Sequence, residues 1–532
     1  MTCAEHGLGY EQMERTACKI REGNHSKWIV LFIVLIGIIV RVINFGRAPC
    51  GLNQDEAFAG YEAFSLLKYG VDSAGYHNPC YFVSWGSGMN VLESYLAIPF
   101  MKLFGCSVIT LRLPQLILSC ISLPVFYLLM KKIFSFQTAL LGLGLLVISP
   151  WHIMLSRWGL ESNLAPAFLL IGFYFFIQGI RNNKYLIFAA IVYGISLYSY
   201  SITWIVVPLT ITVCGLYIVF TKQTPPYSYI LIFAAILFVF ALPLLLFLLV
   251  NKGIIPEIAT SFFSIPKLVV MRDSEISIKN LFSAQSYANL LHILLNQNDG
   301  LLWNSTRQFG LFYQISFPFV LIGAAKMIFV TAKSIAKRTF AYEALIVFGM
   351  LSSVFTCLLI ANLNVNKSNS LHFFTLILLT VGIKETFGIL KSRFIAPAVI
   401  LCSYALLFLF FSFFYFGSYN RQISGSFRYG VQGAVEYVNK QNYDSVCVDS
   451  SIYYSQILFF DQTPHDVFRT TVQYSNYPSA FLNVEQFGKY KFGIDYDHLE
   501  AGQVYIAKAD QSDSFVRKNF QVVHFEEYIV AF

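Results

Sequence analysis

The sequence predicts an all-α protein that crosses a membrane many times and carries a small α/β domain at its C-terminal end. Three observations lead to this fold class. Of the 532 residues, 56% are apolar and only 12% are charged, about half the charged fraction of a soluble domain. Apolar segments of about 20 residues, the length that crosses the hydrocarbon layer, recur along the chain. After residue 416 the apolar segments shorten and polar residues return.

Residues 1–27 form a polar tail that carries Lys19, Arg21 and Lys27 directly before the first apolar segment. No small-residue cleavage pattern follows this segment, so we interpret it as an uncleaved span rather than a signal peptide. Lys and Arg gather in cytoplasmic loops of membrane proteins. The tail is therefore predicted to lie in the cytoplasm.

About eleven spans are predicted within residues 28–416. They lie near 28–46, 107–130, 136–154, 160–179, 185–200, 203–220, 228–250, 309–330, 342–362, 369–389 and 395–416. With the N-terminus inside, most short loops rich in Lys and Arg fall on the cytoplasmic side, including the one that holds Lys384, Lys391 and Arg393. The same orientation places two long loops, 47–106 and 251–306, outside the membrane together with residues 417–532.

The last 116 residues, 417–532, have the pattern of a small α/β domain. Val431–Gln441 has helical spacing, and Ser445–Val448 has the pattern of a buried strand. Val504–Lys508 and Gln521–Phe525 are predicted as further strands. A chain of this length suffices for one modest core.

The net charge of +8 does not indicate nucleic-acid binding, because the Lys and Arg residues lie mostly in short loops between apolar segments. The ten cysteines are scattered, most of them within apolar segments, and show no metal-binding spacing. Cys50 and Cys80 share the first outer loop. Both a disulfide between them and two free thiols agree with the sequence.

The first outer loop begins with an acidic pair at the start of a predicted juxtamembrane helix. Asn53 is a plausible N-cap, Asp55 and Glu56 follow in the first turn, and the helix reaches about Tyr69. The two acids either complement the helix dipole or belong to a catalytic site just outside the membrane. A helix N-terminus keeps a carboxylate ionised, as a general base requires. Later in the loop, Glu93 is either a second site acid or a cap that aids solubility.

Two arginines near the outer ends of spans depart from the charge rule. Arg112 opens the second span, and such an arginine either snorkels to lipid phosphate or binds an anion or acid. Arg157 lies in an outer turn together with His152 and Glu161. Because Arg157 and Glu161 are four residues apart, they form either a simple pair or a phosphate-binding arginine oriented by the acid.

A dense polar run between the tenth and eleventh spans is the last candidate site element. It includes Asn366, Lys367 and Asn369. The run either forms a plain interhelical turn or binds substrate, with the lysine on a phosphate and the amides on sugar hydroxyls.

Over about residues 28–416 the chain resembles the GT-C glycosyltransferases, near the protein O-mannosyltransferases and the lipid A aminoarabinose transferases. The acidic pair Asp55-Glu56 and the segment Thr110–Pro114 carry the resemblance most specifically. Ser156–Ser162 looks like that family's second outer loop, and Asn366–Asn369 looks like its late polar turn. The family usually has an arginine in that turn. Lys367 keeps the charge but not the two-pronged guanidinium.

The resemblance implies a sugar donor on a polyprenyl phosphate, presented from the outer leaflet of a plasma membrane, and by family analogy this membrane would be bacterial. Asp55 would take the proton of an acceptor hydroxyl, giving inversion, and Glu56 would orient a neighbour or a cation. Arg112, Arg157 and Lys367 would stabilise the departing phosphate. Supporting roles would fall to other polar residues of the same outer face: Glu93, His152, Glu161, Asn366 and Asn369.

The acceptor would be a protein, a glycolipid or a cell-wall polymer, and membrane lipids would surround the spans. The family's metal-binding histidine has one candidate counterpart, His292, which lies in an apolar helical pattern. No metal ligand is therefore assigned, although a divalent metal stays open as a cofactor. A lipid or sugar transporter or flippase is the main alternative, and a membrane scaffold is a second. Transporters place ionisable residues near the membrane midplane, whereas here the polar clusters gather at one face.

Overall fold

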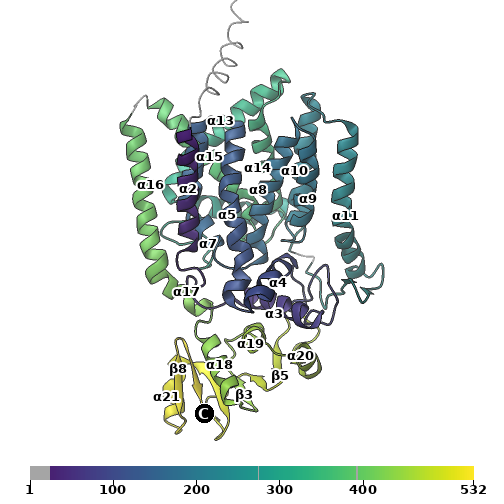
Figure 1. Ribbon diagram of the computed structural model, residues 1–532, viewed down its shortest axis with the longest axis vertical. Helices are drawn as coiled ribbons and strands as arrows, with labels where there is room; N and C mark the ends of the chain where they lie inside the picture. The colour runs from purple at the N-terminus through teal and green to yellow at the C-terminus, as the bar shows by residue number, and fades with distance from the viewer. Residues whose placement is uncertain (1–23, 273–274, 391–393) are drawn as a thin grey trace, which may run out of the picture.

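The computed structural model describes residues 24–272, 275–390 and 394–532. A bundle of long helices forms one part, and a domain built around a β-sheet lies at one end of it (Figure 1). This confirms the predicted fold class. Most of the predicted N-terminal tail, residues 1–23, lies outside the described residues, as do Lys391 and Arg393.

The bundle consists of helices that coincide with the predicted apolar segments. They are α2 (Asn24–Val42), α5 (Val108–Ile133), α6 (Phe136–Ile148), α7 (Pro150–Leu155), α8 (Glu161–Gly179), α9 (Lys184–Ser196), α10 (Thr203–Phe220), α11 (Tyr227–Asn251), α13 (Phe317–Lys337), α14 (Tyr342–Leu358), α15 (Asn369–Ile389) and α16 (Ile395–Phe414). Within the described residues, seven helices are long and apolar enough to cross a membrane, and α6, α9 and α14 are shorter apolar helices. The number of spans stays a prediction.

One predicted span, 309–330, is displaced along the chain, because α13 covers Phe317–Lys337. The backbone N–H groups of Leu311 and Phe312 donate to the side-chain oxygen of Gln297 at 3.2 and 2.8 Å. These residues are therefore held in a loop and do not extend the helix. Apolar composition alone does not distinguish such a buried loop from the first turns of a span.

Helices at the sheet-domain end of the bundle, here called the domain-side end, lie outside the long helices. They are α3 (Gln54–Tyr69), α4 (Leu92–Phe104) and α12 (Ala284–Asn296), with a short hairpin of β1 (Ile258–Ala259) and β2 (Ser264–Ile265) and the 3₁₀ turns η1 (Ile278–Phe282) and η2 (Gln314–Ser316) nearby. The predicted N-cap is confirmed: the side chain of Asn53 accepts from the backbone N–H of Asp55 at 3.0 Å. The helix ends at Gly70, which has a left-handed backbone conformation.

The C-terminal domain is a mixed seven-stranded sheet with helices, reached through the π turn η3 (Tyr415–Tyr419). Its elements are α17 (Asn420–Ser426), α18 (Val431–Gln441), β3 (Val446–Val448), α19 (Tyr454–Asp461), α20 (His465–Thr471), β4 (Gln473–Tyr474), β5 (Val484–Phe487), β6 (Tyr490–Phe492), β7 (Val504–Lys508), η4 (Ala509–Gln511), α21 (Ser512–Val516), β8 (Val522–Phe525) and β9 (Tyr528–Ala531). The strand order is β4-β5-β6-β3-β7-β9-β8. Strand β3 runs parallel to both of its neighbours, and the other pairs are antiparallel. The predicted helix and strands coincide with α18, β3, β7 and β8.

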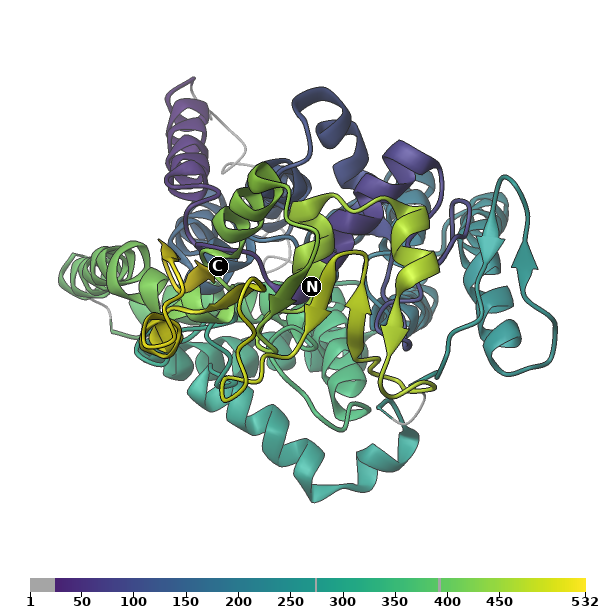
Figure 2. The same ribbon diagram turned by 90° about the horizontal axis from the view of Figure 1, so that it is seen from below.

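The C-terminal domain packs on α3, and Figure 2 shows its sheet lying across the domain-side end of the bundle. Gln456 donates from its side chain to the carbonyl of Leu52 at 2.6 Å, and Ser455 donates to the carbonyl of Gln54 at 2.9 Å. The ring of Phe459 lies against Gly60 in the middle of α3. Helix α19 thus fixes the start of α3 from outside the bundle.

The closest helix–helix contact of the bundle joins α13 and α15. A Cβ atom on Gly323 would overlap the carbonyl of Leu378, and one on Gly382 would overlap the carbonyl of Phe319. Small residues allow such backbone contact between membrane helices, where packing rather than water exclusion drives association.

We expect Gly382→Ala to separate α13 from α15 and to lower the yield of folded protein, because the added methyl group meets backbone rather than a flexible side chain. The thermal midpoint of purified protein in detergent should fall by several degrees. Gly388→Ala in the same helix meets no atom within 4 Å and is the matched control. Equal thermal midpoints for both variants would contradict the importance of this contact.

Candidate active site

A fully buried ion pair joins α3 to α5 at the domain-side end. The guanidinium of Arg112 donates from Nε and Nη2 to the two carboxylate oxygens of Glu56 at 2.6 and 2.8 Å, and both side chains are 0% exposed. Arg112 also donates to the carbonyls of Pro49 and Gly51 at 2.9 and 2.8 Å. The backbone N–H of Gly159 donates to Glu56 at 2.8 Å. One carboxylate therefore holds three segments of the chain together.

The predicted pairing of Arg157 with Glu161 is wrong. Arg157 donates from Nε, Nη1 and Nη2 to the carbonyls of Ala48, Arg41 and Ile43 at 2.6, 2.9 and 2.6 Å. The helical spacing suggested a pair, but α8 begins only at Glu161, so Arg157 lies in the preceding turn and faces the end of α2. The acid has other partners.

The predicted phosphate roles of Arg112 and Arg157 do not agree with these contacts. All three nitrogen atoms of each guanidinium donate to protein oxygens, and both side chains are buried. A buried cation is tolerated only with such partners. Glu56 does orient a cation, as predicted, and that cation is Arg112.

His152 also lies away from its predicted neighbours. Its Nδ1 accepts from the guanidinium of Arg41 at 2.7 Å, and the ring is buried. Arg41 donates further to the carbonyls of Gly37 and Leu146 at 2.9 and 3.1 Å. The pair therefore ties α2 to the junction of α6 and α7, behind the acidic pair of α3.

Asp55 follows the N-cap of α3 and is partly buried. Burial raises the pKa of its carboxyl to about 6, while the positive charge of Arg272 acts in the opposite direction. A carboxylate in this state is ionised at neutral pH and is a stronger base than a solvated aspartate. Asp55 is thus suited to take a proton.

Glu161 is the first residue of α8 and faces the same region. Its carboxylate accepts from the backbone and side-chain N–H groups of Asn90 at 2.5 and 2.8 Å. The Asn90 amide also donates to Ser201 at 3.2 Å, and Ser201 lies 3.2 Å from the hydroxyl of Tyr81. The side-chain oxygen of Asn90 is buried and has no partner among the described residues.

Arg272, in the second long loop, was missed by the sequence analysis. It is close enough to act electrostatically on both Asp55 and Glu161. Its Nη1 lies 3.3 Å from Glu275, and the other carboxylate oxygen of Glu275 accepts from Nζ of Lys367 at 3.2 Å. The signal that could have identified it is an arginine in a loop expected outside the membrane, against the positive-inside rule.

The late polar turn contributes one cation to this region and one structural amide. Lys367 is only partly buried and faces Glu275. Asn369 is buried, accepts from the indole N–H of Trp151 at 2.9 Å and donates to the carbonyl of Ser162 at 3.2 Å. Asn366 is half-buried. The turn therefore both packs against α7 and α8 and places Lys367 toward the second long loop.

Glu93 lies in the first turn of α4 and is fully buried, so it does not aid solubility. Both carboxylate oxygens lack a hydrogen-bond partner among the described residues. Burial, and after it the negative charge of Glu56, raises the pKa of Glu93 well above its usual range. The buried carboxyl therefore binds its proton more tightly than a solvated glutamate does. It lies against Gly159, where a Cβ would come within 2.7 Å of its Oε1.

The cysteines and His292 do not form a shared site. Cys50 and Cys80 are both free thiols, and the Cys80 side chain is buried. The Nδ1 of His292 lies 2.8 Å from the side-chain amide of Asn296 on the exposed face of α12. Within residues 24–272, 275–390 and 394–532, no group of three His, Cys, Asp or Glu side chains is arranged to hold a metal ion.

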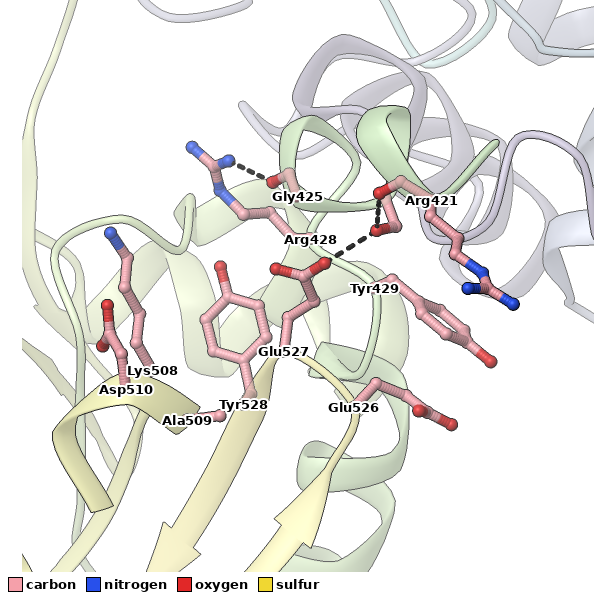
Figure 3. Close-up of a pocket in the computed structure, with 11 residues that line it drawn as sticks. Arg421, Gly425, Arg428, Tyr429, Lys508, Ala509, Asp510, Glu526, Glu527 and Tyr528 are labelled. Atoms are coloured by element: carbon pink, nitrogen blue, oxygen red, sulfur yellow. Dashed lines mark hydrogen bonds between the residues drawn. The ribbon is translucent and has the colours of Figure 1, made fainter. Parts of the chain in front are cut away.

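A cavity lies elsewhere, between α17 and the sheet of the C-terminal domain (Figure 3). Its volume is about 650 Å³, and it contains three basic and three acidic side chains: Arg421, Arg428, Lys508, Asp510, Glu526 and Glu527. Most of these side chains are exposed. The cavity includes none of the residues predicted for the active site, and its opposite charges are balanced, as on an ordinary solvated surface.

Comparison with known proteins identifies the fold. Residues 91–252 match the dolichyl-phosphate-mannose-protein mannosyltransferase family, while no curated protein matches the sequence. The chain is similar to ArnT from Cupriavidus metallidurans in the apo state, with 11% identity, a TM-score of 0.57 and coverage of 96% of this chain and 98% of ArnT. The structure of ArnT bound to undecaprenyl phosphate matches with 10% identity, a TM-score of 0.57 and coverage of 95% and 98%.

The oligosaccharyltransferase of Archaeoglobus fulgidus, in complex with Zn and sulfate, matches with 14% identity and a TM-score of 0.50. The match covers 81% of this chain and 61% of that protein. The matched family and these structural neighbours are glycosyltransferases. The chain therefore has the GT-C fold that its motifs predicted.

We expect Arg112→Met to destabilise the protein by about 3–5 kcal/mol, because it leaves Glu56 buried without its cation. The thermal midpoint of the purified protein measures the effect. Lys326→Met is the control, since Lys326 and Glu385 form an exposed pair worth about 1 kcal/mol or less. A midpoint for Arg112→Met equal to that of the control would show that the buried pair is dispensable.

Glu93→Gln should stabilise the protein at neutral pH while leaving its shape unchanged. Because the pKa of Glu93 is higher in the folded state than in the unfolded state, the free energy of unfolding falls as the pH rises above the unfolded pKa of about 4.5. Each pH unit up to the folded pKa costs roughly 1.4 kcal/mol, and the amide avoids this cost. Thermal midpoints measured from pH 4 to pH 8 should diverge in favour of the variant. Parallel curves would mean that Glu93 is ionised in the fold.

Proposed function

We propose that this protein is an integral membrane glycosyltransferase that moves a sugar from a polyprenyl phosphate to an acceptor hydroxyl at the outer face of the membrane. The observation that carries the proposal is that Asp55 lies within the electrostatic influence of Arg272 at the domain-side end of a GT-C bundle. Undecaprenyl phosphate bound to ArnT supports a lipid phosphate as the carrier. The acceptor is a hydroxyl of a protein, a glycolipid or a cell-wall polymer.

In the proposed reaction, the acceptor oxygen attacks the anomeric carbon while its proton passes to the carboxylate of Asp55. The bond between the anomeric carbon and the phosphate oxygen breaks, and polyprenyl phosphate leaves with the bonding electrons. Attack opposite the leaving group inverts the configuration at that carbon. The position of Asp55 at a helix N-terminus and its pKa of about 6 support its role as base.

The negative charge that develops on the phosphate requires a nearby cation. Arg272 and Lys367 are the cations we assign to this role, because each is only partly buried and faces the acids of the site. Glu275 contacts both of them, Arg272 at 3.3 Å and Lys367 at 3.2 Å. Glu161 and Asn90 are placed to bind sugar or acceptor hydroxyls. Arg112 and Arg157 act behind the site by fixing its frame.

The same proposal places the domain-side end outside the cell membrane and the opposite ends of the helices in the cytoplasm. Helix α5 begins near α4 and ends at Lys131 and Lys132. Lys132 and Arg181 both lie 5.8 Å from the ring centroid of Tyr342, so these basic residues gather at one end of the bundle. Cytoplasmic loops carry this excess of positive charge.

Asp55→Asn tests the proposal directly. The substitution keeps the size of the side chain and removes the base, so release of polyprenyl phosphate from a polyprenyl-phosphate sugar by purified protein should fall about a hundredfold or more. Asp495→Asn, at an exposed position of the C-terminal domain, is the matched control. Equal turnover by wild type and Asp55→Asn would make Asp55 a helix-capping acid only. No release from any such donor, with acceptors present, would favour the transporter.

The pH dependence of the rate is a second test of Asp55 as the general base. The wild-type rate should fall about tenfold for each pH unit below about 6, because a protonated Asp55 cannot accept the hydroxyl proton. The residual rate of Asp55→Asn should lack this step. A wild-type profile that stays flat between pH 5 and pH 7 would exclude Asp55 as the base.

A further inference from the structure

A loop of the C-terminal domain, residues 475–483, lies against the candidate active site and is here called the covering segment. The backbone N–H of Leu482 donates to the carbonyl of Trp85 at 2.8 Å, and Phe481 pairs with Gly86 as in an antiparallel bridge. Gly86 has a φ of +94°, and a Cβ there would overlap the carbonyl of Ser479. The covering segment is thus joined by backbone contacts to the loop beside Asp55.

The ring of Phe481 is the part of the covering segment that reaches the charges of the site. The guanidinium carbon of Arg272 lies 5.0 Å from the centroid of this ring, within the range of a cation–π contact. Arg272 also pairs with Glu275, three residues along the chain, at 3.3 Å. An exposed pair of this kind holds a side chain weakly.

We propose that Phe481 is a positioning residue that holds Arg272 toward the donor phosphate. Asp55 and Glu275 both attract Arg272, and a freely rotating guanidinium would turn to either acid. The ring face supplies a contact that is neutral and planar, so it fixes the guanidinium without neutralising its charge. The inference rests on the proposed function, because it gives a donor-binding role to Arg272.

The ring of Phe481 is not needed to fold the covering segment. The side chain is 58% exposed. The segment is closed by Asn476, whose amide donates to the carbonyl of Phe481 at 2.8 Å and whose oxygen accepts from the backbone N–H of Asn483 at 2.8 Å. Neither bond uses the side chain of Phe481, so this side chain can be exchanged while the loop keeps its shape.

The test uses the purified full-length protein and undecaprenyl phosphate as the probe. Phe481→Leu should weaken binding of this lipid about three- to tenfold and lower kcat/KM for the donor at least as much, whereas Phe481→Trp should stay within about twofold of wild type. In an Arg272→Gln background, Phe481→Leu should cause no further loss. Phe262→Leu, at an exposed position of the second long loop, is the control.

Wild-type affinity in Phe481→Leu would overturn the positioning role and leave the proposed function intact. The same loss with and without Arg272 would also overturn it, because the ring would then act through another group. Failure of the wild-type protein to bind undecaprenyl phosphate or to use any polyprenyl-phosphate sugar would instead remove the proposed function, and this inference with it. The rescue by Trp separates a contact through the ring face from loss of apolar volume.

Discussion

The ion pair between Glu56 and Arg112 organises the domain-side end of this protein. Both side chains are withdrawn from solvent, and their remaining hydrogen-bonding capacity is used by the backbone of the loop before α3 and of the turn before α8. A buried ion pair of this kind is tolerated when all of its hydrogen-bonding groups have partners. Because Asp55 immediately precedes Glu56, the network that fixes Glu56 also fixes the place of the proposed base.

The arginines of this region divide into two groups by their surroundings. Arg41, Arg112 and Arg157 are buried, and backbone carbonyls, His152 or Glu56 satisfy them. Arg272 is exposed, and among the described residues its guanidinium contacts the exposed acid Glu275 and the ring of Phe481 while lying near Asp55 and Glu161. A guanidinium whose N–H groups all donate to protein oxygens stabilises the frame, whereas one with fewer partners has donors left for a substrate. In the proposed site, the arginine that is free to bind substrate therefore lies in a loop, while the helices and their buried arginines fix the shape of the site.

The sequence patterns predicted those features that depend on residues close to one another along the chain. The Asn53 cap, the start of α3 and the whole of α18 followed from capping preference and apolar spacing. The partners of Arg157 and Glu161 did not, because the end of α2 and the loop at Asn90 approach them only in the folded chain. Strands β4, β5, β6 and β9 were not predicted, although at two to four residues each they are similar in length to the predicted β3 and β8. Arg272 lacked any motif and was placed by tertiary structure alone.

The bonds between α19 and the start of α3 link residues about 400 positions apart: Ser455 with Gln54, and Gln456 with Leu52. During synthesis, the first membrane helices are made and inserted long before the segment that completes their outer end exists. The helix that carries the proposed base therefore reaches its final surroundings only after the last quarter of the polypeptide has been made and has folded. The domain-side end is thus among the last parts of the molecule to be completed, although its first helices are among the first to be made.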